Sequence, residues 1–199
     1  MQRWCLLVML VCGACGVDGG AAISDAPGGG GGGDGGGGGD GAVVVGEPAN
    51  LIGITAAHNQ VRAMVQTSPA LPPLTWSPAL AATAAAWVAQ CKDTMAPIGL
   101  VDHNDGRSTG HPYYVGENIF ASSAGATGQQ AVTSWAAEGA NYNYASNTCS
   151  GGTCGHYTQI VWRTSLEIGC ALGDCPGLTY RSTIVCDYGP GGNSGGKPY

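Results

Sequence analysis

Apolar residues recur three or four positions apart in three stretches of the chain, a spacing typical of amphipathic helices. The first stretch runs from Leu51 to Gln66, with Asn50 as its candidate N-cap. The second opens at Ser77-Pro78, because serine caps a helix and proline suits its first turn. The third opens at Thr127-x-x-Gln130, which has the spacing of a capping box. We therefore predict three helices.

Runs of β-branched and aromatic residues, which favour strands, follow the third helix. We predict three strands: Tyr157 to Trp162, Ile168 to Leu172 and Thr183 to Tyr188. A further short ordered segment, Val115 to Ala121, precedes the third helix. His156 directly precedes the first strand, so we expect it at a strand edge, where an imidazole faces a cleft or satisfies a core hydrogen bond. Helices that come first and strands that come last predict an α+β fold.

The first residues have the features of an export signal. Met1-Gln2-Arg3 is followed by an apolar run too short to span a bilayer, which predicts a secretory signal peptide over residues 1–15. Two outcomes stay open: cleavage releases the protein, or Cys15 is the acylated first residue of a bacterial lipoprotein. Residues 16–47 are predicted to be a linker, and the glycine-rich tract at 28–41 makes it a flexible tether.

Residues 48–199 are predicted to form one domain with enough residues for a real core. The net charge is -6, and the seven Lys and Arg residues form no basic run, so we expect no nucleic-acid partner. No second apolar segment of the sequence is long enough to span a membrane, so we expect membrane contact only through a lipid anchor at Cys15. We also expect a monomer.

The predicted domain contains an even number of cysteines. These are Cys91, Cys149, Cys154, Cys170, Cys175 and Cys186. In an exported protein, six such residues predict three disulfides, and zinc-ribbon spacing is absent from them. Fifteen pairings are compatible with six cysteines, and spacing alone does not choose among them.

Two histidines and two glutamates are the candidate site residues: His103, Glu117, Glu138 and His156. Two imidazoles with two carboxylates can hold a divalent ion such as zinc, or share protons across a cleft. Their spacing in the sequence does not bring the four together. An alternative is that both glutamates have structural roles: Glu117 would bond neighbouring backbone amides, and Glu138 would cap a loop.

Several motifs follow one another in an order that resembles a known family. The first set is His58-Asn59-x-x-Arg62, Leu74-x-Trp76, Gly116-Glu117-Asn118-Ile119 and Trp135-x-x-Glu138. Gly155–Trp162 (GHYTQIVW), Ile184–Asn193 (IVCDYGPGGN) and the closing Pro198-Tyr199 complete it. The chain from about Leu51 onward resembles the CAP superfamily of cysteine-rich secretory proteins, antigen 5 and pathogenesis-related class-one proteins. We expect an exported bacterial member.

This resemblance implies a three-layer α-β-α sandwich around an antiparallel sheet. His103 and His156 would bind zinc or a similar ion, and Glu117 and Glu138 would reach the ion mainly through water. The bridges would be Cys149–Cys154, Cys170–Cys186 and Cys91–Cys175. In the family the first cleft histidine lies only a few residues after a cysteine, whereas His103 lies farther from Cys91. Because of this departure from the family pattern, His111 is a second candidate for the place given to His103.

The resemblance favours a non-enzymatic binding domain whose ligand is a small lipid, a sterol or a protein partner. A zinc-dependent hydrolase, a peptidase or esterase with Glu117 or Glu138 as the base, is the rival. The sequence has no H-E-x-x-H pair, and the domain cysteines are assigned to bridges. A third reading is an extracellular interaction module without a working cleft.

Overall fold

The computed structural model describes residues 46–199, so the predicted signal peptide, Cys15 and nearly all of the linker lie outside the described residues. A four-stranded sheet with the strand order β1-β5-β6-β2 forms the centre. Its strands are β1 (Thr75–Trp76), β2 (Gly116–Ser122), β5 (Glu167–Asp174) and β6 (Ser182–Gly189). A separate small hairpin pairs β3 (Tyr142–Asn143) with β4 (Thr148–Cys149).

The central sheet is mixed rather than antiparallel, which corrects one expectation. Strand β6 pairs antiparallel with both β5 and β2. The short strand β1 pairs parallel to β5, with Thr75 opposite Glu167 and Trp76 opposite Ile168. A parallel pair needs a long crossover, and the chain between β1 and β5 supplies one through its helices.

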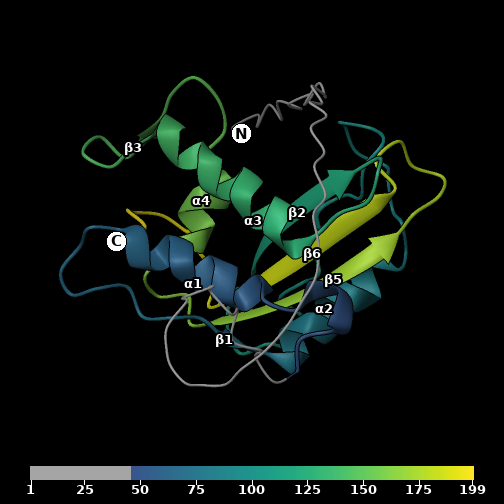
Figure 1. Cartoon of the computed structure of the whole chain (residues 1–199), viewed down its shortest axis with the longest axis horizontal. Coiled ribbons are helices and arrows are strands. Elements are labelled where there is room, and N and C mark those ends of the chain that lie inside the picture. Colours follow the sequence, from purple (N-terminus) through teal and green to yellow (C-terminus); the bar gives the residue numbers. More distant parts are fainter. Residues whose placement is uncertain (1–45) are drawn as a thin grey trace, which may run out of the picture.

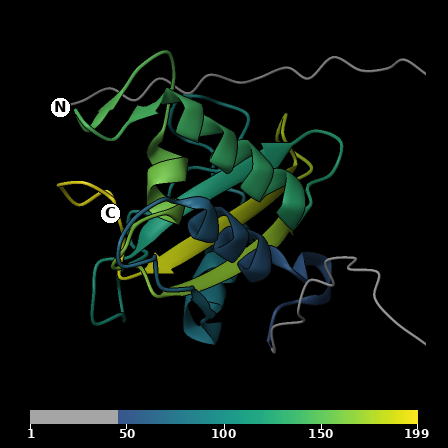
Figure 2. The ribbon, with the colours of Figure 1, turned by 60° about the vertical axis from the view of Figure 1, so that its left-hand side comes forward.

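Helices cover both faces of this sheet, and the expected three layers are confirmed (Figures 1 and 2). The helices are α1 (Ile54–Met64), α2 (Pro78–Val88), α3 (Gly128–Ala137) and α4 (Gly155–Ile160), with short 3-10 turns η1 (Ala49–Leu51) and η2 (Glu138–Asn141). Helix α2 packs on β5 and β6 from one side, while α1, α3 and α4 pack on one another on the other side. No helix of residues 46–199 is long and apolar enough to cross a membrane.

The two faces have separate cores. The core on the α1 side is larger and includes Ile54, Trp135, Ile160 and Tyr188. The core under α2 is small, and its buried members are Ala84, Val88, Ala171 and Val185. Strand β5 and α2 approach closely at Gly169, where an added Cβ would lie 2.1 Å from the backbone nitrogen of Ala81.

Two predicted helix starts are confirmed, and one is wrong. Thr127 and Gln130 form the full capping box of α3. Helix α2 begins at Pro78 with Ser77 as its N-cap residue. The first helix begins later than predicted, after Gly53, because the carboxylate of Glu47 accepts the backbone amides of Gly53 (2.7 Å) and Thr55 (2.9 Å).

The predicted strand from Tyr157 to Trp162 is wrong, because residues 155–160 form helix α4. His156 therefore lies in the first turn of a helix and not at a strand edge. The Thr158 side chain donates to the carbonyl of Cys154, and Ile160 is fully buried in the larger core. Packing against α3 and η2 overrides the β-propensity of this run.

Buried Arg62 ties α1 to distant parts of the chain. Its guanidinium donates to the carbonyls of Pro72 (2.7 Å), Ile160 (2.7 Å), Trp162 (2.8 Å) and Ser165 (3.2 Å). All these acceptors are backbone oxygens, so one side chain satisfies several groups that would otherwise lack partners.

All three disulfides implied by the family resemblance are present: Cys91–Cys175, Cys149–Cys154 and Cys170–Cys186. Such bridges are typical of proteins from oxidising compartments.

Candidate functional site

The first of two imidazole–carboxylate pairs joins a loop to the start of β2. Nδ1 of His103 lies 2.6 Å from Oε1 of Glu117, and the backbone amide of Asn104 donates to the same oxygen at 3.0 Å. The Glu117 side chain is 1% exposed, whereas that of His103 is 50% exposed. A buried carboxylate thus stands behind an imidazole that reaches the surface.

The loop that carries His103 is fixed by its neighbour Asp102. The Asp102 carboxylate accepts the amide and hydroxyl of Thr94, both at 2.8 Å, and the amide of Met95 at 3.1 Å. Burial alone would raise the pKa of Asp102, but these hydrogen bonds outweigh it and lower the pKa below its ordinary value. The indole of Trp87 also donates to the Asp102 carbonyl at 2.7 Å.

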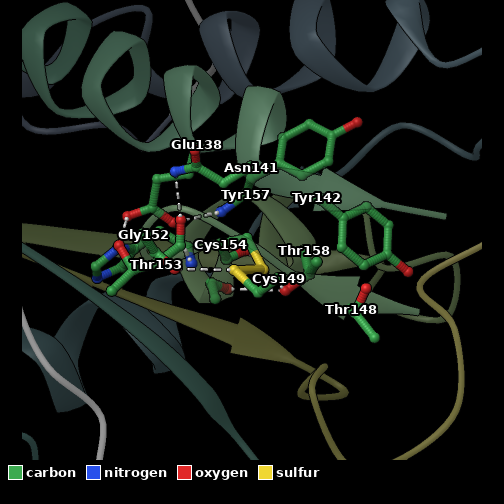
Figure 3. Close-up of a disulfide and its surroundings, with 12 residues drawn as sticks. Glu138, Asn141, Tyr142, Thr148, Cys149, Gly152, Thr153, Cys154, Tyr157 and Thr158 are labelled. Atoms are coloured by element: carbon green, nitrogen blue, oxygen red, sulfur yellow. Dashed lines mark hydrogen bonds and ion pairs between the residues drawn. A yellow bond between two sulfur atoms is a disulfide. The ribbon is translucent and has the colours of Figure 1, made fainter. Parts of the chain in front are cut away.

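The second pair joins the end of α3 to the start of α4. Nδ1 of His156 lies 2.7 Å from Oε1 of Glu138, and the Thr153 hydroxyl donates to that oxygen at 3.0 Å. The backbone amides of His156 (3.0 Å) and Tyr157 (3.4 Å) donate to Oε2 of Glu138. Figure 3 shows Glu138 beside Thr153 and Tyr157.

Hydrogen bonding keeps Glu138 ionised. Burial would raise the pKa of this carboxyl, but the hydrogen bond and charge of His156 and the bond from Thr153 lower it below its ordinary value. The carboxylate therefore orients the His156 ring and anchors the first turn of α4 at the same time.

Asn118 connects the two pairs. It follows Glu117 in β2 and is almost fully buried. Its Nδ2 donates to the carbonyl of His156 (3.1 Å) and to the hydroxyl of Tyr188 (3.0 Å). Because adjacent residues in a strand point to opposite faces, Glu117 and Asn118 leave β2 on opposite sides. Asn118 points toward Tyr188 and α4, so the Glu117 side chain of the first pair leaves the other face of this edge strand.

His58 extends this network into the core. Its Nδ1 lies 2.7 Å from the carbonyl of Ile54 and its Nε2 lies 2.8 Å from the Tyr188 hydroxyl. The carbonyl requires Nδ1 to donate, so Nε2 accepts from Tyr188. Burial lowers the pKa of His58 to about 4. His58 is thus a neutral ring with both nitrogens bonded, which is a structural role in the core.

A third carboxyl group, which the sequence reading missed, faces Glu117. Asp187 of β6 is directly opposite Glu117 of β2 and is fully buried. Both Asp187 oxygens and Oε2 of Glu117 are buried without a hydrogen-bond partner. Burial, and next the charge of Glu117, raise the pKa of Asp187 to about 8. The only feature of the sequence that marks Asp187 is that a charged residue interrupts an apolar strand.

Comparison with known proteins identifies the family. The family described as "CAP: Cysteine-rich secretory protein family" matches residues 55–188. The chain belongs to this CAP family. Pathogenesis-related protein 1 of Arabidopsis thaliana is 40% identical over 144 residues, which cover 71% of this chain and 78% of the plant protein. GLIPR1-like protein 1 of Homo sapiens is 38% identical over 151 residues, or 71% of this chain and 59% of the human protein.

Solved structures agree with this CAP assignment. Venom allergen-like protein 4 of Schistosoma mansoni matches with a TM-score of 0.54 and 30% identity, covering 73% of this chain and 90% of that one. NaASP2, solved with Zn2+, matches with a TM-score of 0.51 and 23% identity, covering 73% and 81%, and at that identity shows the fold alone. These relatives are plant and animal proteins, so they lend no support to the expected bacterial origin.

Within the CAP domain, the structure places His103 beside Glu117 and puts His111 elsewhere. Nε2 of His111 lies 3.0 Å from the hydroxyl of Thr83 on α2, and its ring stacks on Tyr113 with centroids 6.0 Å apart. His103, and not His111, is therefore the histidine that bonds Glu117.

Each imidazole–carboxylate pair has the donor arrangement of an oriented metal-binding imidazole. Each histidine is paired through Nδ1 with a carboxylate, and no hydrogen bond involves Nε2 of either ring within the described residues. That is the arrangement in which an outer carboxylate orients a metal-binding imidazole. No group of three or more His, Cys, Asp or Glu residues within 46–199 is arranged to hold an ion, so the two pairs do not by themselves form one ion site.

Two open hollows lie away from these four residues. One, of about 520 Å³, is lined by residues that include Asn50, Leu172 and Arg181. The other, of about 430 Å³, runs between α2 and β5 and has an apolar lining that includes Trp76 and Ala85. Neither hollow includes a member of the two imidazole–carboxylate pairs.

Proposed function

We propose that this chain is an exported CAP-domain binding protein in which His103 and His156 hold a divalent cation, with zinc as the first choice. Cleavage at the signal peptide and acylation of Cys15 in a bacterial cell are the two forms that export would take. The ligand would be a small lipid or a protein partner that approaches the site at the edge of β2.

One observation carries the metal proposal: both histidines use Nδ1 on a carboxylate. Glu117 and Glu138 thereby favour the tautomer with a proton on Nδ1, which leaves the lone pair of Nε2 for an ion. A bound ion would act as an electrophile toward a polar ligand group. The residues of the chain fix the two rings, and the half-exposed ring of His103 gives the ligand access. The crystal structure of NaASP2 with Zn2+ is consistent with zinc as the ion.

Binding is favoured over hydrolysis by the state of the two glutamates. Both oxygens of Glu138 already accept hydrogen bonds, from residues 153–157. Oε1 of Glu117 accepts from His103 and Asn104, and its side chain is 1% exposed. A general base needs an oxygen within hydrogen-bond reach of a water. Both Glu138 oxygens are already bonded, and the unpartnered Oε2 of Glu117 is buried away from the surface.

Isothermal titration of the oxidised protein with zinc tests the proposal. We expect one site in the wild type, and a loss of affinity of at least about tenfold in His103→Ala and in His156→Ala. His111→Ala is the matched control, since it removes an imidazole that bonds to α2. Absence of zinc binding in the wild type, or an equal loss in the control, would overturn the assignment.

The proposed lipid ligand needs its own test, since the site residues line neither hollow. We expect fluorescently labelled oleate to bind the zinc-loaded protein. Its affinity should fall in His103→Ala, because the His103 side chain is half exposed and its partner Glu117 is buried. Binding that is unchanged by chelator and by this variant would separate lipid binding from the imidazole site.

A further inference from the structure

The Cys149–Cys154 bridge closes a short loop directly before α4. Cys149 ends strand β4, and Cys154 is the N-cap residue of α4, two residues before His156. Figure 3 shows this disulfide next to Thr153, Glu138 and Tyr157. The bridge and the second imidazole–carboxylate pair therefore share one short segment of chain.

This bridge is the most accessible of the three. Cys149 is exposed, as are its neighbours in residues 145–152. Cys170 and Cys186 are 1% and 0% exposed, and Cys175 is 0% exposed and shielded under α2 beside the half-buried Cys91. A reductant must reach a sulfur atom before it can attack it, so the Cys149–Cys154 bridge is the first that a dithiol in solution can open.

Its loop is also the shortest, with a sequence separation of 5 against 16 and 84 for the other two. The entropy that a crosslink removes from the unfolded chain grows with the length of the loop it closes. Opening the Cys149–Cys154 bridge therefore affects the stability of the whole domain less than opening either of the others. The fold can persist while this segment loosens.

Few other hydrogen bonds hold residues 149–153 in place, whereas the tip of the hairpin also binds the C-terminal tail through Asn147 and Lys197. Hairpin β3–β4 has two residue pairs, and the stretch that follows is fastened by Ser150 N to the Asn141 carbonyl (2.9 Å) and Asn141 Nδ2 to the Thr153 carbonyl (3.0 Å). Gly151 and Gly152 between the two cysteines leave the backbone flexible once the crosslink is gone.

The same segment supplies every donor to Glu138. The Thr153 hydroxyl, the His156 ring and the amides of His156 and Tyr157 all converge on its two oxygens. Loss of the crosslink frees Thr153 and leaves the first turn of α4 held from outside the loop by Asn118 and Asn193, which bond the His156 and Gly155 carbonyls. The bond that fixes the tautomer of His156 is thereby weakened. The first pair, His103 with Glu117, has no contact with this loop among the hydrogen bonds of the described residues.

We infer that the Cys149–Cys154 bridge is a redox clasp: closed, it holds His156 on Glu138, and opened by a dithiol, it releases that half of the site. One thiolate of the reductant attacks the Cys149 sulfur, the Cys149–Cys154 bond breaks, and Cys154 leaves as a thiolate that takes up a proton. The second thiol of the reductant then displaces Cys149. The reductant becomes a disulfide, and the protein gains two electrons and two protons as two thiols.

Hydrogen exchange tests the clasp without reference to a metal. The oxidised protein is treated with increasing dithiothreitol, and mass mapping follows which bridge opens. We expect Cys149–Cys154 to open first and amide exchange at His156 and Tyr157 to rise at least about tenfold, while β5 and β6 stay protected. Prior opening of another bridge, or unchanged exchange at both amides after selective opening, would overturn the inference.

Two variants separate the clasp from general mobility of the loop. The double substitution Cys149→Ala and Cys154→Ala should reproduce the reduced state without a reductant. Asn147→Ala is the matched control, because it cuts the bond of the hairpin to the Gly196 carbonyl (2.8 Å) but keeps the bridge. Equal exchange at His156 in the control and in the double variant would refute a special role of the bridge.

The claim that the Cys149–Cys154 bridge controls ion binding rests on the proposed function, so the affinity for zinc is measured in a separate experiment. We expect it to fall about tenfold in the double variant. If neither the wild type nor the variant binds zinc while exchange still rises, the clasp stands and the proposed metal site fails. If the wild type binds zinc and the double variant binds it equally well, the clasp does not control the site.

Discussion

Replacing Asp187 by Asn should change how the stability of the domain depends on pH. The pKa of Asp187 is raised from 3.8 to about 8, chiefly by burial and then by the charge of Glu117. The folded state therefore keeps a proton that the unfolded chain releases. This contribution to stability is complete below pH 4 and is lost as pH rises to about 8. A shift of about four pKa units corresponds to roughly 5 kcal/mol at 1.36 kcal/mol per unit.

His58 acts in the opposite direction over part of this range. Its pKa is lowered from 6.5 to about 4, so the unfolded state binds the extra proton between these values. Its contribution of roughly 3 kcal/mol is present above pH 6.5 and is lost as pH falls toward 4. In the wild type the slopes from His58 and Asp187 oppose each other between pH 4 and 6.5. Above pH 6.5 only that of Asp187 remains.

Urea unfolding of the oxidised wild type and Asp187→Asn at several pH values between 4.5 and 8 measures this difference. Asn has nearly the same shape as Asp and cannot ionise. Any packing cost of the substitution is the same at every pH, so it does not affect how the difference in unfolding free energy changes with pH. We expect the free energy of unfolding of the variant to gain about 1.4 kcal/mol on the wild type for each pH unit. A difference that does not change with pH would refute the reasoning, because it would mean that Asp187 does not hold a proton in the fold.

Three further substitutions test the packing. Arg62→Met should cost about 3–5 kcal/mol in urea unfolding, because it leaves buried carbonyls without a donor. Gly169→Ala should lower the stability by about 3 kcal/mol, since its Cβ would collide with the backbone of α2, whereas Gly177→Ala meets nothing and should be neutral. Thr127→Ala should cost about 1 kcal/mol in thermal unfolding through loss of the capping box, and a cost no larger than that of exposed Thr133→Ala would contradict it.

Local signals predicted the parts of the fold that local chemistry decides. The capping box at Thr127 and the proline at position 78 mark where α3 and α2 begin. The β-branched runs of residues 168–172 and 183–188 lie within β5 and β6. The same rule failed at Tyr157–Trp162, because burial against α3 and η2 decides its conformation and no local signal reports that contact.

The candidate site was predictable only in its residue types. Motif order selected Glu117, Glu138 and His156, but which histidine joins Glu117 depends on the path of an irregular loop held by Asp102. The opposition of Glu117 and Asp187 depends on the register of β2 against β6. Both are contacts between distant residues, and a single sequence does not encode them in any local pattern.

The contacts of Arg62 have a consequence for how the protein is made. Its guanidinium binds carbonyls 98, 100 and 103 residues further along the chain. Strand β1 likewise pairs with residues 167 and 168, and the Cys91–Cys175 bridge spans 84 residues. Contacts of such long range form slowly and only after their partners have been synthesised. The first helix therefore cannot complete its docking until residues 160–165 have been synthesised, so this part of the fold forms after most of the chain has been made.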